Sequence, residues 1–343
     1  MRNSKKTFYI FGGLVLLLIA AMGANLSLGS VPIPIEDIFS SLFGGQTGRE
    51  SWQYIIWNYR LPKALTAILI GGGLSLSGLL MQTLFRNPLA GPFVLGVSSG
   101  ASLGAALLIM GVSVLGGLGA GFLTSDLSLI VASGLGSFLV LVTVLAVATR
   151  LKDAMALLIV GLMFGSITAA LVTVLSYFSQ AEQLQQYIFW SYGSIGNLSW
   201  SQVGLLSIFV LAGVGISIGL LKALNALLLG EKYAVSMGIS TSRSRNWIIL
   251  ATGLLAGGIT AFAGPIAFIG LAVPHLARQL LSTQDHRILL PGVLLYGGIL
   301  MLVCDVIAQL PFSAYVLPIN AITSLVGAPV VIWLLLRRNR MLF

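Results

Sequence analysis

Ten long apolar runs, each of a length that can cross a bilayer as a helix, dominate this sequence. An α-helix needs about 20 predominantly apolar residues to cross the hydrocarbon core of a membrane. Only 8% of the 343 residues are charged, against roughly 25% in soluble domains, so the chain cannot cover a water-facing surface. The sequence therefore predicts an all-α membrane protein with one transmembrane domain over residues 1–343. The ten predicted spans are residues 8–28, 61–85, 92–112, 127–149, 155–178, 201–221, 246–264, 265–281, 288–309 and 317–336.

The positions of the basic residues predict which side of the membrane each loop faces. Cytoplasmic loops of membrane proteins are enriched in Lys and Arg. With both termini in the cytoplasm, only Arg49, Arg60 and Lys63 of the 18 basic residues lie outside. The opposite orientation would reverse this bias. We therefore predict cytoplasmic N- and C-termini, and we attribute the net charge of +9 to topology rather than to nucleic-acid binding.

Two of the ten runs are irregular. Arg2, Lys5 and Lys6 precede the first run as they would in a secretory signal, but the run is long and no convincing cleavage site follows, which favours an uncleaved helix. Pro265 and Pro274 interrupt the eighth run. That span is predicted to be short or broken, which is tolerated where protein rather than lipid surrounds it.

The sequence holds little that could carry chemistry. No GxxxxGK[ST] phosphate loop occurs, so the chain is not expected to hydrolyse ATP itself. His275 and His286 are eleven residues apart and Cys304 is the single cysteine, so we predict no catalytic residue, no metal site and no cofactor. Asp305 is the main charge inside a span, and it either pairs locally or lines a pathway.

The scarcity of titratable groups inside the spans bears on the energy source. A proton- or sodium-coupled secondary carrier needs such groups near the middle of the membrane, and an intramembrane enzyme needs a converging nucleophile and base or a metal site. Neither pattern is present. A transport pathway powered by a partner protein is the better interpretation, with the ion-coupled carrier as the alternative from another class.

Several polar stretches, or stretches containing proline and glycine, interrupt the apolar pattern. They are Arg60–Lys63, Arg86–Pro92, Gly96–Ala101, Leu229–Ile239, Gly264–His275, Asp285–Arg287 and Gly327–Pro329. Taken together and in this order, they closely resemble the FecCD-type permeases of binding-protein-dependent ABC importers, a family that takes up ferric siderophores, haem and cobalamin. Each stretch is weak alone, but the combination extends over most of the chain and is specific.

The resemblance implies the ten-helix permease fold of type II ABC importers. It also implies a second permease copy, most simply in a homodimer, two cytoplasmic ABC ATPase subunits and an extracytoplasmic substrate-binding protein, all arranged around a pathway in membrane lipid. The expected cargo is an iron chelate, either a siderophore or haem, because these are the commoner substrates of the family. Cobalamin is the alternative cargo, and no residue decides between them.

The inner loop 222–245 is the predicted coupling region for the ATPase. In the family, the stretch that matches 229–239 has this role, and a short rigid helix pressed into a groove of the ATPase can act as a lever. Gly230 and Gly238 are expected to bracket that helix. A surface helix at the level of the lipid headgroups is the alternative. The predicted coupling residues are Leu229, Gly230, Glu231, Ala234, Met237 and Gly238.

Arg60 and Lys63 lie one helical turn apart on the predicted outer side, where they could pair with carboxylates of a docking protein. The family usually has two arginines here, so Lys63 keeps the charge and loses the planar fork. A further family arginine is replaced by Gln309, and the usual Pro-Ile-Gly before the last span ends in Asn320. Docking with altered charge pairing is expected, and snorkelling of both side chains to the interface is the alternative.

Small and hydroxylated residues mark a possible substrate pathway. Such a surface would pass a bulky ligand without gripping it, which suits a transporter whose selectivity resides in its binding protein. Close helix packing explains the same residues equally, as it does the ladder Gly96, Gly100 and Gly104. The candidate pathway residues are Ser98 and Ser99 in the third span and Gly161, Gly165, Ser166 and Thr168 in the fifth.

Overall fold

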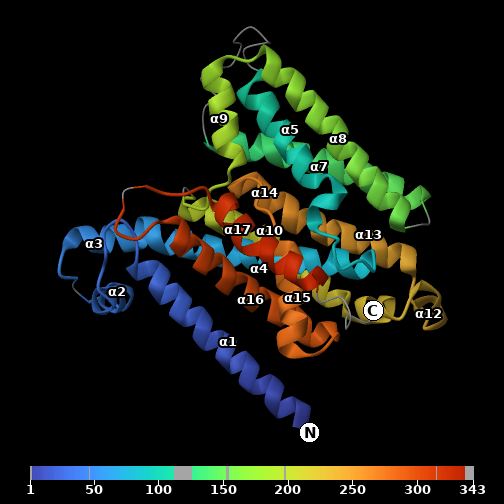
Figure 1. Cartoon of the computed structure of the whole chain (residues 1–343), viewed down its shortest axis with the longest axis horizontal. Coiled ribbons are helices and arrows are strands. Elements are labelled where there is room, and N and C mark those ends of the chain that lie inside the picture. Colours follow the sequence, from blue (N-terminus) through green and yellow to red (C-terminus); the bar gives the residue numbers. More distant parts are fainter. Residues whose placement is uncertain are drawn as a thin grey trace. The chain divides into compact units, whose positions relative to one another are not determined.

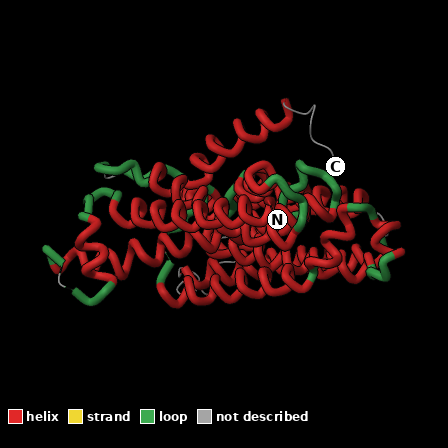
Figure 2. Tube along the Cα trace, turned by 90° about the horizontal axis from the view of Figure 1, so that it is seen from below, coloured by secondary structure: helices red, strands yellow, loops and turns green. Residues whose placement is uncertain are grey.

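The computed structural model describes residues 2–45, 47–111, 126–151, 154–196, 198–313 and 315–336, and every regular element in these ranges is helical (Figures 1 and 2). Short turns join most of the helices. In chain order, the α-helices are α1 Arg2–Ser27, α2 Ile35–Leu42, α3 Glu50–Ile55, α4 Leu61–Leu84, α5 Val97–Ile109, α7 Asp126–Arg150, α8 Ala154–Phe178, α9 Ala181–Ser191, α10 Trp200–Gly219, α11 Leu221–Leu228, α12 Glu231–Ser236, α13 Thr241–Thr252, α14 Gly258–Ala263, α15 Ile269–Leu281, α16 His286–Ala308 and α17 Ile319–Leu336.

The predicted spans correspond to these helices, with some differences at their ends. Seven helical stretches within the described residues are long and apolar enough to cross a membrane, and α5 and α17 are shorter apolar helices. The remaining predicted span, residues 265–281, is α15, which has Pro274 inside it. The prediction of an all-α membrane protein is confirmed. The side of the membrane on which each terminus lies stays a prediction.

The second span is longer than the sequence predicted. Helix extends without a break over Glu50–Leu84, because a π-helical turn, Ile56–Arg60, joins α3 to α4. Pro62 cannot donate the usual helical hydrogen bond, and the wider turn just before it accommodates this loss. At 1.5 Å per residue, 35 residues extend about 52 Å, well beyond the roughly 30 Å of hydrocarbon. We therefore interpret α3 as an extension past the membrane.

The proline- and glycine-containing stretches break helices where the sequence suggested. Pro92–Leu95 forms a 3₁₀ turn that ends at Gly96 with φ +72°, and α5 starts at the next residue. Between α14 and α15 the chain leaves the helix at Gly264, also at φ +72°. The backbone N–H of Ala267 in this break donates to Asn320 Oδ1 at 3.0 Å. Asn320, which departs from the family's glycine, thus satisfies a donor that a broken helix exposes.

Contacts group the chain into two compact units, each built from segments far apart in the sequence. The first unit comprises Met1–Ser75, Ser194–Ile208 and Ala267–Met341. In it α16 packs against α1, α15 and α17 (Figure 1). Gly71 of α4 and Gly297 of α16 meet so closely that a Cβ on either would collide with the other's carbonyl oxygen. This grouping leaves the predicted single domain untested.

The second unit comprises Leu76–Gly193 and Phe209–Ile266. Its core is α5, which packs against α7, α8 and α9 (Figure 1). A Cβ on Gly100 of α5 would lie 2.5 Å from the carbonyl oxygen of Gly136 in α7. Gly104 likewise meets Ala132 of α7, whereas Gly96 meets Gly161 of α8, so the ladder is a backbone-to-backbone packing surface in which small residues let helices approach closely.

Three short helices were not predicted. The helices α2 and α9 lie in segments that the sequence analysis treated as outer loops, and α11 lies in the inner loop. The start of α9 is held by a reciprocal capping box of Gln180 and Gln183, whose N-cap is not the usual Ser or Thr of this sequence signature. All three are much shorter than the roughly 20 apolar residues of a membrane span, so no long apolar run in the sequence marks them.

Candidate coupling and docking sites

The predicted coupling region folds as two short helices joined by a tight turn. Within residues 222–245, α11 ends at Leu228, α12 covers Glu231–Ser236, and α13 begins at Thr241. Gly230 precedes α12 with φ +109° and Gly238 follows it with φ +78°. Both values lie where side chains with a Cβ are strained, so the two glycines set the ends of α12. The prediction that they bracket a short helix is confirmed.

Hydrogen bonds at the end of α12 explain how so short a helix is held. The N–H of Gly238 donates to Val235 O at 2.9 Å, and the N–H of Ile239 donates to Ala234 O at 3.0 Å. This pair of bonds with a left-handed glycine is the Schellman motif, which satisfies the free carbonyls at a helix end. The Ser240 side chain then accepts from the N–H of Arg243 and caps the start of α13.

The side chains of α12 divide into an anchor and an exposed apolar surface. Ala234 is fully buried, so it fixes α12 to the helices beside it. Leu229, Val235 and Met237 are 64%, 59% and 58% exposed. Exposed apolar side chains gathered on a polar-rimmed helix are typical of a protein or membrane contact. We name the surface of Leu229, Val235, Met237 and Tyr233 the coupling surface.

On the predicted outer side, Arg60 is buried rather than presented to solvent, with 9% of its surface exposed. Its guanidinium donates to the carbonyl oxygens of Leu26, Ser27 and Val31. The first two belong to the last turn of α1, where carbonyls lack a partner within the helix, and a cation there also interacts favourably with the helix dipole. Arg60 thus closes the end of α1. Its predicted role in docking stays a prediction.

Lys63 forms an ion pair with Asp305, the intramembrane carboxylate of the sequence analysis. Lys63 Nζ lies 3.0 Å from Asp305 Oδ1, and the two side chains are 17% and 2% exposed. Asp305 Oδ2 accepts from Asn25 Nδ2 at 2.8 Å and from Gln309 Nε2 at 2.7 Å. Of the two interpretations of Asp305, local pairing is therefore the one observed. We name Lys63, Asp305, Asn25 and Gln309 the outer cluster.

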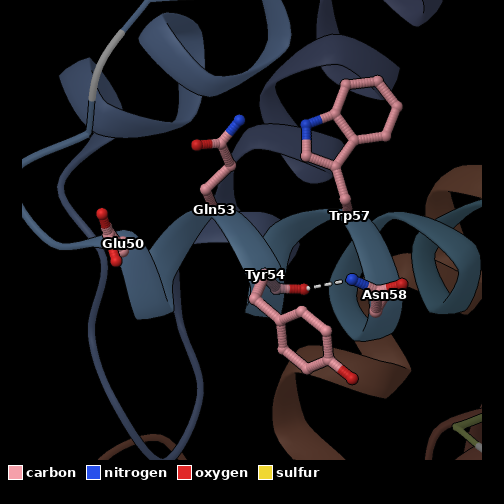
Figure 3. Close-up of a pocket in the computed structure, with 5 residues that line it drawn as sticks. All are labelled: Glu50, Gln53, Tyr54, Trp57 and Asn58. Atoms are coloured by element: carbon pink, nitrogen blue, oxygen red, sulfur yellow. Dashed lines mark hydrogen bonds between the residues drawn. The ribbon is translucent and has the colours of Figure 1, made fainter.

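A shallow depression of about 530 Å³ lies on the helical segment directly before Arg60. Glu50, Gln53, Tyr54, Trp57 and Asn58 line it (Figure 3). Figure 3 shows Gln53 and Trp57 on one side of the helix and Tyr54 on the other, with Asn58 Nδ2 donating to the Tyr54 carbonyl at 3.0 Å. The exposed aromatic and polar groups of this depression therefore belong to α3 and the π-helical turn.

Most of the candidate pathway residues lie in helix contacts inside the second unit. Ser98 is buried, with its Oγ 3.2 Å from Thr260 Oγ1, and a Cβ on Gly161 would collide with the Val94 carbonyl. A Cβ on Gly165 would lie 3.4 Å from the Ser99 hydroxyl. These contacts favour close packing as the explanation for four of the six residues.

The two remaining candidates differ from each other. Thr168 is buried and its hydroxyl donates to the carbonyls of Phe164 and Gly165 within α8. Ser166 lies on the exposed face of α8, together with Leu162 and Ile167, and its hydroxyl donates to the Leu162 carbonyl. A lining role for Ser166 stays a prediction.

None of the predictions linked Asp305 to its polar partners. Asn25 could not be linked to Asp305, because 280 positions separate them. Gln309 was noted only as a departure from an arginine, and its bond to Asp305 spans a single helical turn. The spacing of four between Asp305 and Gln309 was the available signal, since such pairs face each other on a helix.

Comparisons with known proteins agree with this architecture. The model of the FecCD transport family matches residues 16–337. The vitamin B12 import system permease protein BtuC of Klebsiella pneumoniae is 38% identical over 338 residues, which cover 98% of this chain and 95% of that protein. BtuC of Salmonella typhi is 38% identical over 288 residues, covering 84% of this chain and 85% of that protein.

Solved structures show the same fold. The inward-facing conformation of a metal-chelate type ABC transporter has a TM-score of 0.83 at 31% identity and covers 96% of this chain and 99% of that chain. Fold and sequence together define the permease subunit of an ABC importer, a class whose ATPase is a separate subunit. The chain belongs to the FecCD transport family. It is a multi-pass protein of the inner membrane.

Proposed function

We propose that this permease carries cobalamin across the inner membrane, driven by ATP hydrolysis on two partner subunits. The observation that supports this cargo is the 38% identity, over 98% of the chain, to a vitamin B12 permease. Iron chelates were the first expected cargo on frequency alone, and the relatives favour the alternative, cobalamin. A corrin ring with its cobalt is itself a large metal chelate, so the metal-chelate type of the solved relative is compatible with this cargo.

The coupling surface is proposed to contact the ATPase. Its support is a rigid short helix, with Gly230 and Gly238 at its ends and Ala234 as its anchor. Exposed Leu229 and Met237 supply apolar area for a groove on the partner, and Glu231 begins the helix. Because the anchor and the Schellman turn transmit displacement to α13, closure of the ATPases would move a spanning helix rather than a loose loop.

The substrate-binding protein is proposed to dock outside, over Arg60, Lys63 and the depression on α3. Lys63 keeps 17% of its side chain exposed while it pairs with Asp305, so a docking carboxylate would share this cation with an existing partner. The exposed aromatic groups Tyr54 and Trp57 offer contact area beside it. We further propose a homodimer of the permease, as the simplest arrangement for the two halves of such an importer.

Uptake by cells that naturally carry the gene tests the cargo. Deleting the gene should abolish uptake of radiolabelled cyanocobalamin at nanomolar concentration and leave uptake of a ⁵⁵Fe-labelled siderophore and of haem unchanged. Restoring the gene on a plasmid should restore cyanocobalamin uptake. If the deletion instead lowers siderophore or haem uptake and spares cyanocobalamin, the cobalamin proposal is wrong and the iron-chelate alternative replaces it.

The partners can be tested in the same cells. An affinity tag on the permease should retain an ATPase with a phosphate loop after mild solubilisation, in a ratio of two to two. Replacing Met237 and Leu229 by serine should release the ATPase, whereas replacing the exposed Leu162 of α8 by serine should not. Equal retention by both variants would remove the coupling surface from the proposal.

A further inference from the structure

A groove between α7 and α13 in the second unit has no role in the proposed transport function. Its volume is about 500 Å³ and it is almost entirely apolar. The walls are formed by Val142 and Ala146 of α7 and by Trp247 and Leu250 of α13. Val142 and Trp247 are 45% and 46% exposed. An exposed apolar groove on a multi-pass membrane protein lies where acyl chains are the solvent.

The groove has one polar end. Thr149, in the last turn of α7, and Arg243, in the first turn of α13, line this end. Arg150 is the last residue of α7 and is also exposed. From Val142 to Thr149 the groove extends about 10 Å along α7 at 1.5 Å per residue. A ligand with a charged head and an apolar tail of at least this length matches the distribution.

The charge at the polar end is positive. Arg243 is exposed, and among the residues that the structure describes it forms no ion pair. It stands in the first turn of α13, where the helix dipole favours an anion. The basic residues of the inner loops predict that this end faces the cytoplasm. Its chemistry therefore fits an anionic headgroup of the inner leaflet.

Asn246 supplies a second polar group in the groove. It lies one turn after Arg243, and its Oδ1 is buried without a hydrogen-bond donor among the described residues. If the Asn246 side chain rotated toward a headgroup hydroxyl, its Oδ1 would lose no hydrogen bond that it now accepts. Beside it, Arg245 Nη2 donates to the Ala148 carbonyl at 2.9 Å, which holds α13 against α7 and keeps the floor of the groove in place.

We propose that this groove binds an anionic glycerophospholipid of the inner leaflet, with its phosphate at Arg243 and one acyl chain between α7 and α13. Basic pockets between membrane helices on the cytoplasmic side are suited to such headgroups. The bound lipid joins the two helices at the point where α13 leaves the Schellman turn of α12. Occupancy therefore stabilises the start of α13, the element to which the coupling helix is attached.

Trp247 provides a direct probe, because it lines the groove and is 46% exposed. The full-length permease is reconstituted in phosphatidylcholine vesicles with increasing fractions of phosphatidylglycerol, one lipid or the other carrying brominated acyl chains that quench tryptophan. Subtracting the signal of Trp247→Phe isolates the fluorescence of this residue. We expect brominated phosphatidylglycerol to compete about fivefold better than brominated phosphatidylcholine, the advantage that one cationic side chain gives an anionic lipid.

Three variants test the assignment. Arg243→Ala should reduce the fivefold preference to near one, and Ala146→Phe should lower the quenching of Trp247 by both lipids at least twofold, because the new ring fills the groove. Arg287→Ala is the matched control, since Arg287 is an exposed arginine in the first turn of α16, and it should keep the preference.

Other outcomes would overturn the proposal. Equal quenching by both lipids in the wild type, or an unchanged preference in Arg243→Ala, would show that no anionic headgroup is selected. Unchanged quenching in Ala146→Phe would place the acyl chain outside the groove. Protection of Trp247 from both brominated lipids would show that a second copy of the chain covers the groove instead.

Discussion

The outer cluster makes a sharp prediction about the Lys63–Asp305 pair. Asp305 is almost completely buried, accepts two hydrogen bonds and pairs with Lys63, whereas Lys63 keeps a route to solvent. Lys63→Met should therefore be worse than Asp305→Asn, because it leaves a buried carboxylate with only two neutral donors. Asp305→Asn leaves an ammonium that can turn toward water. The double variant removes both charges and should be better than Lys63→Met alone.

The magnitudes follow from burial. Removing one partner of a buried pair costs about 3–5 kcal/mol, and we expect about 4 kcal/mol for Lys63→Met. For Asp305→Asn we expect about 2 kcal/mol, because only hydrogen bonds to a charged group are lost. Independent effects would sum to about 6 kcal/mol in the double variant, whereas a coupled pair should cost about 3 kcal/mol, within the range of couplings between contacting residues.

The single cysteine provides the assay. Cys304 is fully buried in α16, beside Asp305, so a thiol-reactive fluorophore reports unfolding in detergent without any engineered probe. At roughly 2 °C per kcal/mol for a large chain, Lys63→Met should lower Tm by about 8 °C and the double variant by about 6 °C. A Tm loss of about 12 °C in the double variant, the sum of the single losses, would refute the coupling. A smaller loss for Lys63→Met than for Asp305→Asn would refute the argument from burial.

Three further changes have expected outcomes. Gly238→Ala should cost about 1–2 kcal/mol of stability in the turn after α12 and lower ATP-driven transport in proteoliposomes severalfold. The control Gly215→Ala, which has open space around its Cα, should transport normally. Equal transport by the two variants would contradict the coupling role. Gly100→Ala should lower Tm in the Cys304 assay by several degrees, because the added methyl group forces α5 and α7 apart. An unchanged Tm would show that the two helices can move apart without loss of stability. Arg60→Gln should lose about 2–3 kcal/mol of stability from the end of α1, and a normal Tm with weakened binding-protein affinity would instead assign Arg60 to docking alone.

The structure changes the interpretation of the two cations on the outer side, Arg60 and Lys63, and their role in docking stays a prediction. In the sequence, Arg60 and Lys63 stood out because they break the positive-inside bias. In the structure, each already has partners within the chain. A docking protein would therefore contact Lys63 as a cation that is already shared with Asp305. We expect the affinity of the docking protein for the permease to depend less on salt than it would if the permease presented two free arginines.

Much of the fold was predictable, because lipid imposes a simple rule on sequence. Without water to satisfy the backbone, a spanning segment must be helical and apolar for about 20 residues. This rule located the spans, and Pro265 of the eighth run lies in a real break between α14 and α15, whereas Pro274 lies inside α15. It could not locate α2, α9 and α11, since short helices outside the hydrocarbon do not need a long apolar run.

The candidate sites divide in the same way. The glycines at the ends of α12 were predictable from local chemistry, because a left-handed residue at a helix end favours Gly. The packing of Gly161 against Val94 was not, since small residues fit both a helix contact and a pathway.

By itself, the sequence determined the solvent, the helical class, the family and the brackets of the coupling helix, because each depends on composition or on local residue patterns rather than on contacts between distant residues. Only the tertiary structure decided that Asp305 pairs with Lys63 and Asn25, that Arg60 closes α1, and that α7 and α13 leave a groove with Arg243 at its end. These contacts join residues tens to hundreds of positions apart. Their energies depend on distance and burial, which a linear sequence does not contain.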